Sequence, residues 1–548
     1  MNFSQISDIL RKIAYKKRRI VLLIFSGLLT GLTLVFTKLG FLEWITMIPT
    51  GIVLLVRASD REVRLRSLYS DGFLFFYSYY LVCYHWFVNL YPLEFIDGMT
   101  KGGALAVVIL AWFGLSLLQA LMGGCVFLFA GLLFRCNLSQ RFPLLRVFVG
   151  AGLWAAFEWS QTIGWWGVPW GRLPIGQSEY LVGLQTASWF GSYFVTFLIV
   201  AVNFLLAHTL LNLPKWRLGV TVAACLLVFQ YGAGTLIWFT TDVSKGEPIK
   251  VAAVQGNISS SDKWSEDSGT KTLEVYSTLI AEAAEKGAEL VLLPETAFPY
   301  DLDSNNYAYL NEGFCSMARE LNIYLLVGAF TQEGEKDSLN SLVCYTPEGE
   351  RLDTVYSKRH LVPFGEYVPM RPIIETLVPP LADLVLSSDD IDEGEGTKII
   401  DAGGVKIGGL ICFDSIYESL TYESVRDGAE LICLGTNDSW FSDSAALYMH
   451  NAQAQLRAIE NGRYVLRAAN TGISTVINSR GEVIAELEPL VSGNAYATVY
   501  ANDAKTLNTN LGNFLVYFIL LGFLVIFSHN IVNIMKINKK RDKNNLTR

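Results

Sequence analysis

The chain is 548 residues long, 51% of them hydrophobic, and its formal net charge of −8 is unevenly distributed. Residues 245–506 carry 19 Lys and Arg against 40 Asp and Glu, a net charge of −21, whereas the remainder carries 24 against 11, a net charge of +13. An acidic polar block inside a basic, apolar remainder excludes a purely soluble enzyme, a disordered protein and a generic nucleic-acid binder.

Long apolar stretches dominate the sequence before residue 245 and return near its end. Each is a candidate to cross the ~30 Å hydrocarbon core of a bilayer as a helix. They predict eight transmembrane helices, at residues 20–36, 41–56, 72–91, 104–134, 147–159, 183–211, 218–239 and 511–534. The first follows a basic segment, but its apolar run is long and no small-residue cleavage site follows Phe36. We therefore expect a retained anchor rather than a signal peptide.

The basic residues outside the acidic block indicate how these helices are oriented. With the N-terminus in the cytoplasm, 21 of them fall in inside segments and three, Lys38, Lys101 and Arg172, fall in outside loops. This asymmetry follows the positive-inside rule. Residues 1–244 are thus predicted to form seven transmembrane helices, residues 245–506 a domain outside the cytoplasm, and residues 507–548 the eighth helix and a basic cytoplasmic tail.

The acidic block alternates short apolar runs with helical stretches. Strands are predicted at 250–255, 289–293, 323–328, 408–411 and 431–434, and helices at 264–286, 305–321, 416–427 and 446–461. Such alternation is typical of an α/β sandwich in which helices cover both sheet faces. Functional groups are expected just beyond the carboxyl ends of the strands.

Three predicted strand ends carry side chains with useful chemistry. Glu295 follows one strand, Lys358 another and Cys412 a third. A carboxylate, an ammonium group and a thiol can serve together as base, oxyanion stabiliser and nucleophile.

The sequence around these three residues resembles the nitrilase superfamily, whose members use a Glu, a Lys and a Cys in this order. More specifically it resembles the membrane-embedded apolipoprotein N-acyltransferase family of that superfamily, over nearly the whole chain. The motifs that carry the resemblance are LPET at 293–296, KRHLVPFGEYVP at 358–369, LICFD at 410–414, NDSWF at 437–441, RAIENGRYVLRAANTG at 457–472 and GVPWG at 167–171. One position departs from the family, because Asp414 stands where a Glu is usual.

The resemblance implies a nitrilase-like α-β-β-α sandwich outside the cytoplasmic membrane of a bacterium, and acyl transfer without ATP, cofactor or metal. Cys412 would take an acyl chain from a phospholipid as a thioester, with Glu295 as the base and Lys358 as the stabilising charge. The acceptor would be the α-amine of the S-diacylglyceryl cysteine that begins a lipoprotein after signal peptide removal. Membrane lipid is the expected environment, and nucleic acid is not an expected partner.

Further residues are assigned to the site by the same resemblance or by their positions. Glu366 is a further carboxylate beside the triad, and the backbone N–H of Phe413 is a second oxyanion donor. Asp414 supports the site, while Asn437 and Trp440 shape the pocket or bind the acyl chain.

On the membrane side, Glu158 lies inside a predicted helix, where an ionisable group needs a polar partner. It is the one convincing intramembrane carboxylate in the sequence, and Trp170 follows in a tryptophan-rich loop with Trp165 and Trp166. We expect Glu158 and Trp170 either to contact the lipid substrate or to anchor the protein at the interface.

The eight cysteines form no CxxC pair and no Cys/His cluster at ligand spacing, which predicts neither a zinc site nor a disulfide framework. Cys344 and Cys433 have apolar neighbours and are expected in the core.

Two other functions remain open from the sequence. The first is a membrane-tethered amidase of nitrilase type, which needs the same triad but only one helix. The second is a transporter or scaffold with an inactive outer domain, which the complete triad disfavours.

Overall fold

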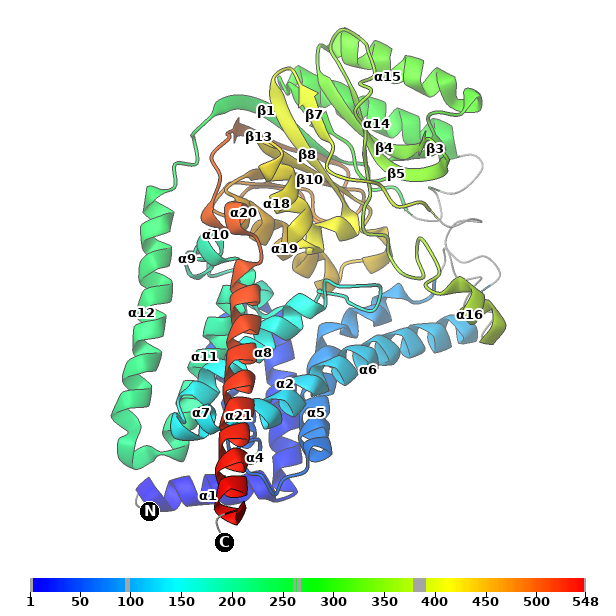
Figure 1. Ribbon diagram of the computed structural model, residues 1–548. Coiled ribbons are helices and arrows are strands. Elements are labelled where there is room, and N and C mark those ends of the chain that lie inside the picture. Colours follow the sequence, from blue (N-terminus) through cyan, green and yellow to red (C-terminus); the bar gives the residue numbers. More distant parts are fainter. Residues whose placement is uncertain (1–2, 94–98, 260–262, 264–267, 378–390, 547–548) are drawn as a thin grey trace. The chain divides into compact units, whose positions relative to one another are not determined.

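The computed structural model describes residues 3–93, 99–259, 263, 268–377 and 391–546. The chain divides into two compact units (Figure 1). One comprises Met1–His85, Ala111–Ile237 and Asn513–Arg548, and the other comprises Trp86–Leu110 and Trp238–Gly512. The first is helical, and the second contains both β-sheets.

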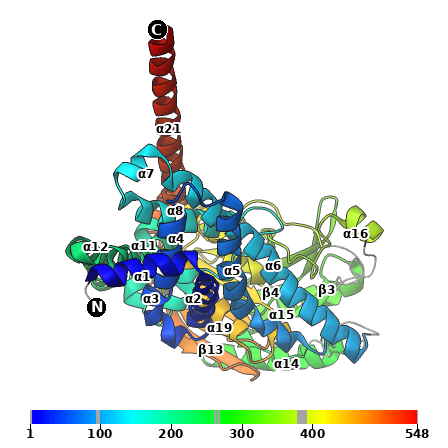
Figure 2. The same cartoon turned by 90° about the horizontal axis from the view of Figure 1, so that it is seen from below.

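The helical unit is built from long apolar helices and short connecting turns. Along the chain these are α1 (Phe3–Tyr15), α2 (Arg18–Val35), α3 (Glu43–Thr46), α4 (Ile48–Arg57), α5 (Leu65–Cys83), α6 (Lys101–Phe134), α7 (Asn137–Arg141), α8 (Leu145–Ser160), α9 (Leu181–Leu184), α10 (Ala187–Phe190), α11 (Ser192–Leu211), α12 (Trp216–Thr240) and α21 (Phe514–Leu546). The first residues of α6 and the last of α12 belong to the other unit. Helix α2 packs along α5, and α11 packs against α4 and α8 (Figure 2).

Among the described residues, six segments are long and apolar enough to cross a membrane: Arg18–Val35, Thr37–Arg57, Lys101–Phe134, Ser192–Leu211, Leu213–Thr240 and Phe514–Asn538. They coincide with six of the eight predicted spans. The other two predictions fall on α5 and α8. Helix α8 has 16 residues, and at 1.5 Å per residue it is about 24 Å long, less than the ~30 Å hydrocarbon core.

Two predicted spans differ in their boundaries or continuity. The prediction of one helix over 183–211 is wrong, because α10 ends at Phe190 and Gly191 separates it from α11; the φ of +77° at Gly191 suits a residue without a side chain. The span predicted at 72–91 begins earlier, as α5, and gives way to a 3-10 helix, His85–Leu90. Aromatic side chains continue from α5 into the 3-10 helix, so the hydropathy of the sequence does not mark the boundary between the two helices.

The helical unit buries more charge than the sequence suggested. Glu158 is not its only buried carboxylate, because Glu43 is fully buried and Asp71 is 1% exposed. Asp71 accepts hydrogen bonds from Arg19 at 3.0 Å and from Arg57 at 2.7 Å. Such pairing is what an apolar surrounding requires of a charged group.

Two mixed sheets form the second unit. The first runs β13 (Gly493–Ala501), β1 (Glu247–Gln255), β2 (Leu290–Leu292), β4 (Tyr324–Glu333), β5 (Lys336–Tyr345), β6 (Tyr356–Ser357), with β3 (Phe298–Asp301) paired to β4. The second runs β12 (Val483–Glu486), β11 (Thr475–Ile477), β10 (Tyr464–Ala469), β9 (Leu431–Thr436), β8 (Val405–Ile411), β7 (Ile399–Ala402). Strands β1, β2 and β4 are parallel, as are β8, β9 and β10.

Alternate residues of each strand point to opposite faces of its sheet. The side chains on one face of each sheet pack against those of the other sheet. One core layer joins side chains of both sheets, including Leu292, Leu342, Cys433 and Leu466. A second layer joins the first sheet to α14 (Ser268–Glu285) and α15 (Ala308–Leu321). The other sheet contacts α18 (Glu418–Arg426) and α19 (Ala445–Asn461), which completes an α-β-β-α sandwich (Figure 1).

The predicted α/β pattern is confirmed in its central elements. All five predicted strands fall within β1, β2, β4, β8 and β9 or extend them by one residue or so, and the helices predicted at 305–321, 416–427 and 446–461 correspond to α15, α18 and α19. Helix α14 matches the prediction at 264–286, although residues 264–267 lie outside the described residues. Strands β3, β5, β7 and β10 to β13 were not predicted.

Shortening a side chain between the sheets tests this core. Leu466→Ala should lower the free energy of unfolding of the purified protein in detergent by about 2–5 kcal/mol, because a buried cavity is left. Ile484→Ala on β12, where the side chain is 44% exposed, is the control and should change it by less than about 0.5 kcal/mol. Equal effects of the two changes would contradict the sandwich.

Candidate active site

The three residues singled out at strand ends converge in the second unit. Glu295 follows β2, where Pro294 cannot continue the strand ladder. Lys358 follows β6 of the same sheet, and Cys412 follows β8 of the opposite sheet. Lys358 Nζ donates a hydrogen bond of 2.9 Å to Glu295 Oε1.

Lys358 lies between two carboxylates. Its Nζ also donates to Glu366 Oε1 at 2.8 Å, and the side chain is 1% exposed. The second oxygen of each carboxylate accepts a backbone N–H, from Asn437 to Glu295 at 2.8 Å and from Val362 to Glu366 at 2.8 Å. The charged groups are therefore fixed from several directions.

Burial and charge act in opposite directions on these groups. Burial raises the pKa of Glu295, but the charge of Lys358 outweighs it and holds that pKa below its usual value. Burial also raises the pKa of Glu366, and there it prevails. Burial lowers the pKa of Lys358, yet Glu295 and Glu366 raise it well above its usual value. The arrangement thus favours an ionised Glu295 beside an ammonium group.

Cys412 begins a 3-10 helix, Cys412–Ile416, and has a φ of +48°. A non-glycine residue in this region stores roughly 1 kcal/mol of strain. Burial and then the charge of Glu295 raise the pKa of its thiol well above the usual value, although Lys358 lowers it. The resting side chain is therefore a thiol, and its proton must leave before the sulfur can attack.

Asp414 joins the segment that contains Lys358 to the segment that contains Cys412. Its Oδ1 accepts the backbone N–H groups of Arg359 and His360 at 3.2 and 2.9 Å. Its Oδ2 accepts the Tyr356 hydroxyl at 2.9 Å and the backbone N–H of Ile411 at 3.1 Å. Burial raises the pKa of Asp414 to about 6. The shorter acid thus fills this position as a clamp between the two sheets.

The remaining residues expected at the site have different surroundings. Asn437 is buried and donates its backbone N–H to Glu295. Phe413 packs its ring edge-on against Tyr417, with centroids 5.5 Å apart, while its backbone N–H lies in the first turn of the helix, outside the helix's own hydrogen bonds. Trp440 is half-buried and precedes Phe441. The ring of Phe441 packs edge-on against that of Trp86, with centroids 4.9 Å apart.

Sequence reasoning missed two polar residues beside Glu295. Asn340 on β5 donates Nδ2 to Glu295 at 2.8 Å and to Glu366 at 3.1 Å. Lys263 donates to the backbone oxygen of Glu295 at 3.2 Å and to Thr296 Oγ1 at 2.6 Å. Burial lowers the pKa of Lys263 to about 7. The sequence indicates a role for Asn340 only in that a polar residue stands at an inward position of β5. It contains no signal that would point to a role for Lys263 at the site.

Glu158 and Trp170 belong to the helical unit. Glu158 Oε1 accepts the backbone N–H of Leu173 at 3.0 Å, and Oε2 accepts Thr196 Oγ1 at 2.5 Å. Trp165 and Trp166 are exposed, whereas Trp170 is buried. Glu158 thus has the polar partners that its position requires. Trp165 and Trp166 have the exposure of interfacial anchors, whereas Trp170 is buried and differs from them in this respect.

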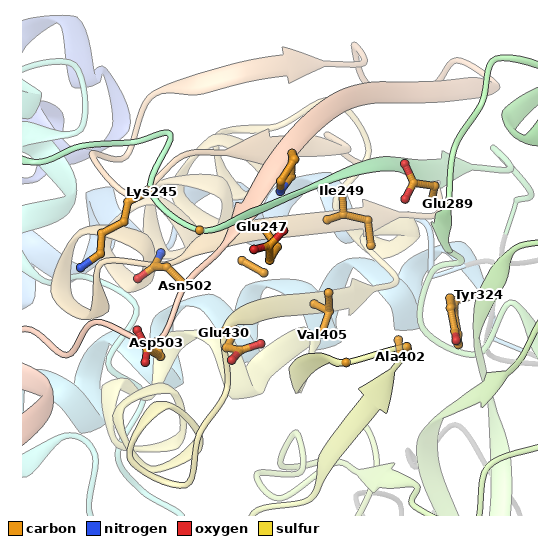
Figure 3. A pocket seen from close by; sticks show the side chains of 15 residues that line it. Lys245, Glu247, Ile249, Glu289, Tyr324, Ala402, Val405, Glu430, Asn502 and Asp503 are labelled. Atoms are coloured by element: carbon orange, nitrogen blue, oxygen red, sulfur yellow. The ribbon is translucent and has the colours of Figure 1, made fainter.

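The second unit also contains a pocket of about 560 Å³ at the opposite ends of the strands (Figure 3). Its lining includes Glu247, Tyr324 and Val405, the first residues of β1, β4 and β8. Glu289 and Glu430 also line it. Glu295, Lys358 and Cys412 are not among its lining residues. The pocket is therefore separate from the candidate active site.

Comparison with known proteins identifies the family. Residues 26–205 match the model of the apolipoprotein N-acyltransferase N-terminal domain, and residues 250–508 match that of carbon-nitrogen hydrolase. An apolipoprotein N-acyltransferase of Gloeobacter violaceus is 31% identical over 83% of this chain and 83% of that protein. The chain belongs to the apolipoprotein N-acyltransferase family.

Other members of the apolipoprotein N-acyltransferase family match at similar levels. One from Geobacter metallireducens is 35% identical over 60% of this chain and 64% of the relative, and one from a Nostoc species is 29% identical over 88% and 94%. Among solved structures, Nit3 of Saccharomyces cerevisiae, of the nitrilase superfamily, covers 47% of this chain and 92% of its own, with 22% identity and a TM-score of 0.37.

The charges around Cys412 can be tested by alkylation. Glu295→Gln removes a charge that raises the pKa of the thiol, so the thiolate fraction increases and iodoacetamide should label Cys412 about three- to tenfold faster at pH 8. Lys358→Met removes the charge that lowers this pKa and should slow labelling. Site-resolved mass spectrometry measures both rates, with Cys433→Ala as a control that leaves them unchanged. Slower labelling of Glu295→Gln would show that Glu295 aids alkylation as a base by more than its charge hinders it by raising the thiol pKa.

Proposed function

We propose that this chain transfers a fatty acyl chain from a phospholipid, through a thioester on Cys412, to the α-amine of the N-terminal S-diacylglyceryl cysteine of lipoproteins. Its relatives are named apolipoprotein N-acyltransferases. The observation that carries the proposal is the buried Lys358 between Glu295 and Glu366, beside a thiol whose pKa Glu295 raises and Lys358 lowers. Phospholipid and the lipoprotein, after signal peptide removal, are the proposed partners.

In the first half-reaction, the Cys412 sulfur attacks the ester carbonyl and its proton passes to Glu295. The charge that develops on the carbonyl oxygen is stabilised by the Lys358 ammonium group and the backbone N–H of Phe413. The ester C–O bond then breaks, and the proton held by Glu295 passes to the departing oxygen. The products are a lysophospholipid and an acyl thioester.

In the second half-reaction, the α-amine of the lipoprotein attacks the thioester. Such an amine, with a pKa of about 7.7–8.0, is largely protonated at neutral pH and has to lose a proton before it attacks. Glu295, again a carboxylate, accepts the proton released as the C–N bond forms. The C–S bond breaks, Cys412 recovers its proton, and the amide product leaves.

The supporting residues have positional roles in this scheme. Glu366 is a second carboxylate that holds Lys358, and Asp414 keeps the lysine segment against the nucleophile segment. Asn437 orients Glu295 through its backbone N–H. We propose that Trp440 shapes the pocket or binds the acyl chain, and that Glu158 and Trp170 contact the lipid substrate or anchor the protein at the interface.

Family membership favours this function over a membrane-tethered amidase, because the match extends over residues 26–205 of the helical part. An amidase needs no such part. The same match and the assembled charges disfavour an inactive scaffold or a transporter.

The proposed enzyme crosses the bacterial cytoplasmic membrane eight times. Its domains are the seven-helix region 1–244, the catalytic domain 245–506 and the region 507–548 with the eighth helix. Both termini are cytoplasmic, and the catalytic domain lies outside. The distribution of Lys and Arg supports this orientation.

An acyl-enzyme assay tests the function directly. Incubation of the purified protein with phospholipid should add one acyl mass that hydroxylamine removes, and peptide mapping should locate it on Cys412. Cys412→Ala should abolish the adduct and at least 99% of acyl transfer, because no nucleophile remains, whereas Cys433→Ala should retain both. An adduct on Cys433, or a fully active Cys412→Ala protein, would refute the assignment. Unchanged acylation of lipoprotein N-termini in cells without the protein would favour the amidase.

The orientation is tested with a membrane-impermeant maleimide. In a Cys225→Ser, Cys315→Ser background, Lys245→Cys should react in intact spheroplasts, whereas Arg61→Cys should react only after lysis. Both parent side chains are exposed, so access depends on the side of the membrane. Labelling of Arg61→Cys in intact spheroplasts would exclude the proposed topology.

A further inference from the structure

A buried polar network lies on the main-chain side of Cys412, and the scheme above makes no use of it. Asp438 follows β9, Arg467 belongs to β10 and His450 belongs to α19. Each side chain is 1% exposed or less. Three separate elements thus contribute polar side chains to one buried region, which is costly unless the groups satisfy one another.

Asp438 is the centre of this network. Arg467 Nη2 donates to Asp438 Oδ2 at 2.6 Å, and His450 Nδ1 lies 3.0 Å from Asp438 Oδ1. Although burial raises the pKa of Asp438, Arg467 and His450 hold it below its usual value. The group is therefore a carboxylate, which only accepts hydrogen bonds, and Arg467 and the His450 ring both lie in position to donate to it. Arg467 Nη2 also lies 3.3 Å from His450 Nδ1.

The other edge of the His450 ring meets the nucleophile segment. Nε2 lies 2.9 Å from Ser415 Oγ and 3.2 Å from the backbone oxygen of Cys412. Ser415 Oγ in turn donates to the same Cys412 oxygen at 2.8 Å. The carbonyl of Cys412 is thus held by a serine whose hydroxyl is itself held by His450.

Peptide planarity connects this carbonyl to the chemistry. In a trans peptide the C=O of one residue and the N–H of the next point in opposite directions in one plane. Groups that hold the Cys412 oxygen therefore also determine the direction of the Phe413 N–H, the oxyanion donor of the proposed mechanism. They also restrain Cys412 in its left-handed conformation, which it would otherwise tend to leave.

We propose that Asp438, His450 and Arg467 are positioning residues that act through Ser415 on the Cys412–Phe413 peptide, and so direct the oxyanion donor and the nucleophile together. This inference rests on the acyl-transfer function proposed above. The network connects one end of β9, the middle of β10 and helix α19 to the reacting residue. The proposal adds to the triad a group of residues that orients the Cys412–Phe413 peptide.

A glycine leaves room for this arrangement. A Cβ atom added to Gly472 would lie 2.3 Å from Asp438 Oδ2, a distance that real Cβ atoms do not reach. Only a residue without a side chain allows the Asp438 carboxylate its position. The motif at 457–472, which contains Arg467 and ends at this glycine, thereby gains a physical reason for its composition.

Two substitutions of His450 separate its two edges. In His450→Gln the amide nitrogen can occupy the place of Nε2, whereas in His450→Asn the amide can occupy only the place of Nδ1. We expect His450→Gln to form the Cys412 thioester within about fivefold of the wild-type rate at saturating phospholipid, and His450→Asn to be slower by about 10- to 100-fold with an unchanged KM, because loss of one oxyanion donor has effects of that order or greater. Ser415→Ala, a small change that should preserve the fold, should resemble His450→Asn.

Asn451→Ala provides the matched control. Asn451 belongs to the same helix and accepts a buried hydrogen bond of 2.9 Å from Thr475, away from the nucleophile. The Asn451→Ala substitution should lower the melting temperature by as much as the His450 substitutions do, while the acylation rate stays unchanged. Equal rates for His450→Asn, Ser415→Ala and wild type, or a rate loss in Asn451→Ala that matches theirs, would overturn the positioning role. A wild-type protein that never acquires the adduct would instead overturn the acyl-transfer function on which the role depends.

Discussion

The ion pairs of Lys358 are the constraint on which the catalytic unit depends. An ammonium group removed from water loses several kcal/mol of solvation, and only close anionic partners restore it. Glu295 and Glu366 provide these partners at 2.9 and 2.8 Å. Because Glu295 follows β2 whereas Lys358 and Glu366 share the loop after β6, the pairing brings these two loops together.

The same pairing explains how one site serves two half-reactions. Glu295 is bound by Lys358, Asn340 and the backbone of Asn437, so it stays in place whether or not it holds a proton. Lys358 keeps its charge because two carboxylates face it. A base that gains and loses a proton beside a permanent cation suits a cycle in which first a thiol and then an amine are deprotonated.

Sequence reasoning succeeded where chemistry is local and failed where it depends on pairing between distant segments. Glu295, Lys358 and Cys412 could be singled out because each stands in a distinctive motif near the end of a strand, and the structure brings the three segments together. Asn340 was missed because its neighbours are ordinary strand residues, and only the β4–β5–β6 pairing brings it between two carboxylates. His450 and Arg467 were inside or near recognised motifs, yet nothing local indicates that they meet beneath Cys412. In the helical unit, hydropathy found the apolar segments but not the break at Gly191, which is a backbone event.

The protonated resting state of Cys412 has a consequence for the lifetime of the enzyme. Peroxides and small disulfides react with thiolates far faster than with thiols. A nucleophile whose sulfur is ionised only during attack on its substrate is therefore protected from sulfenic acid formation and mixed disulfides between turnovers. An oxidising surrounding reacts readily with a permanently ionised cysteine and more slowly with a resting thiol.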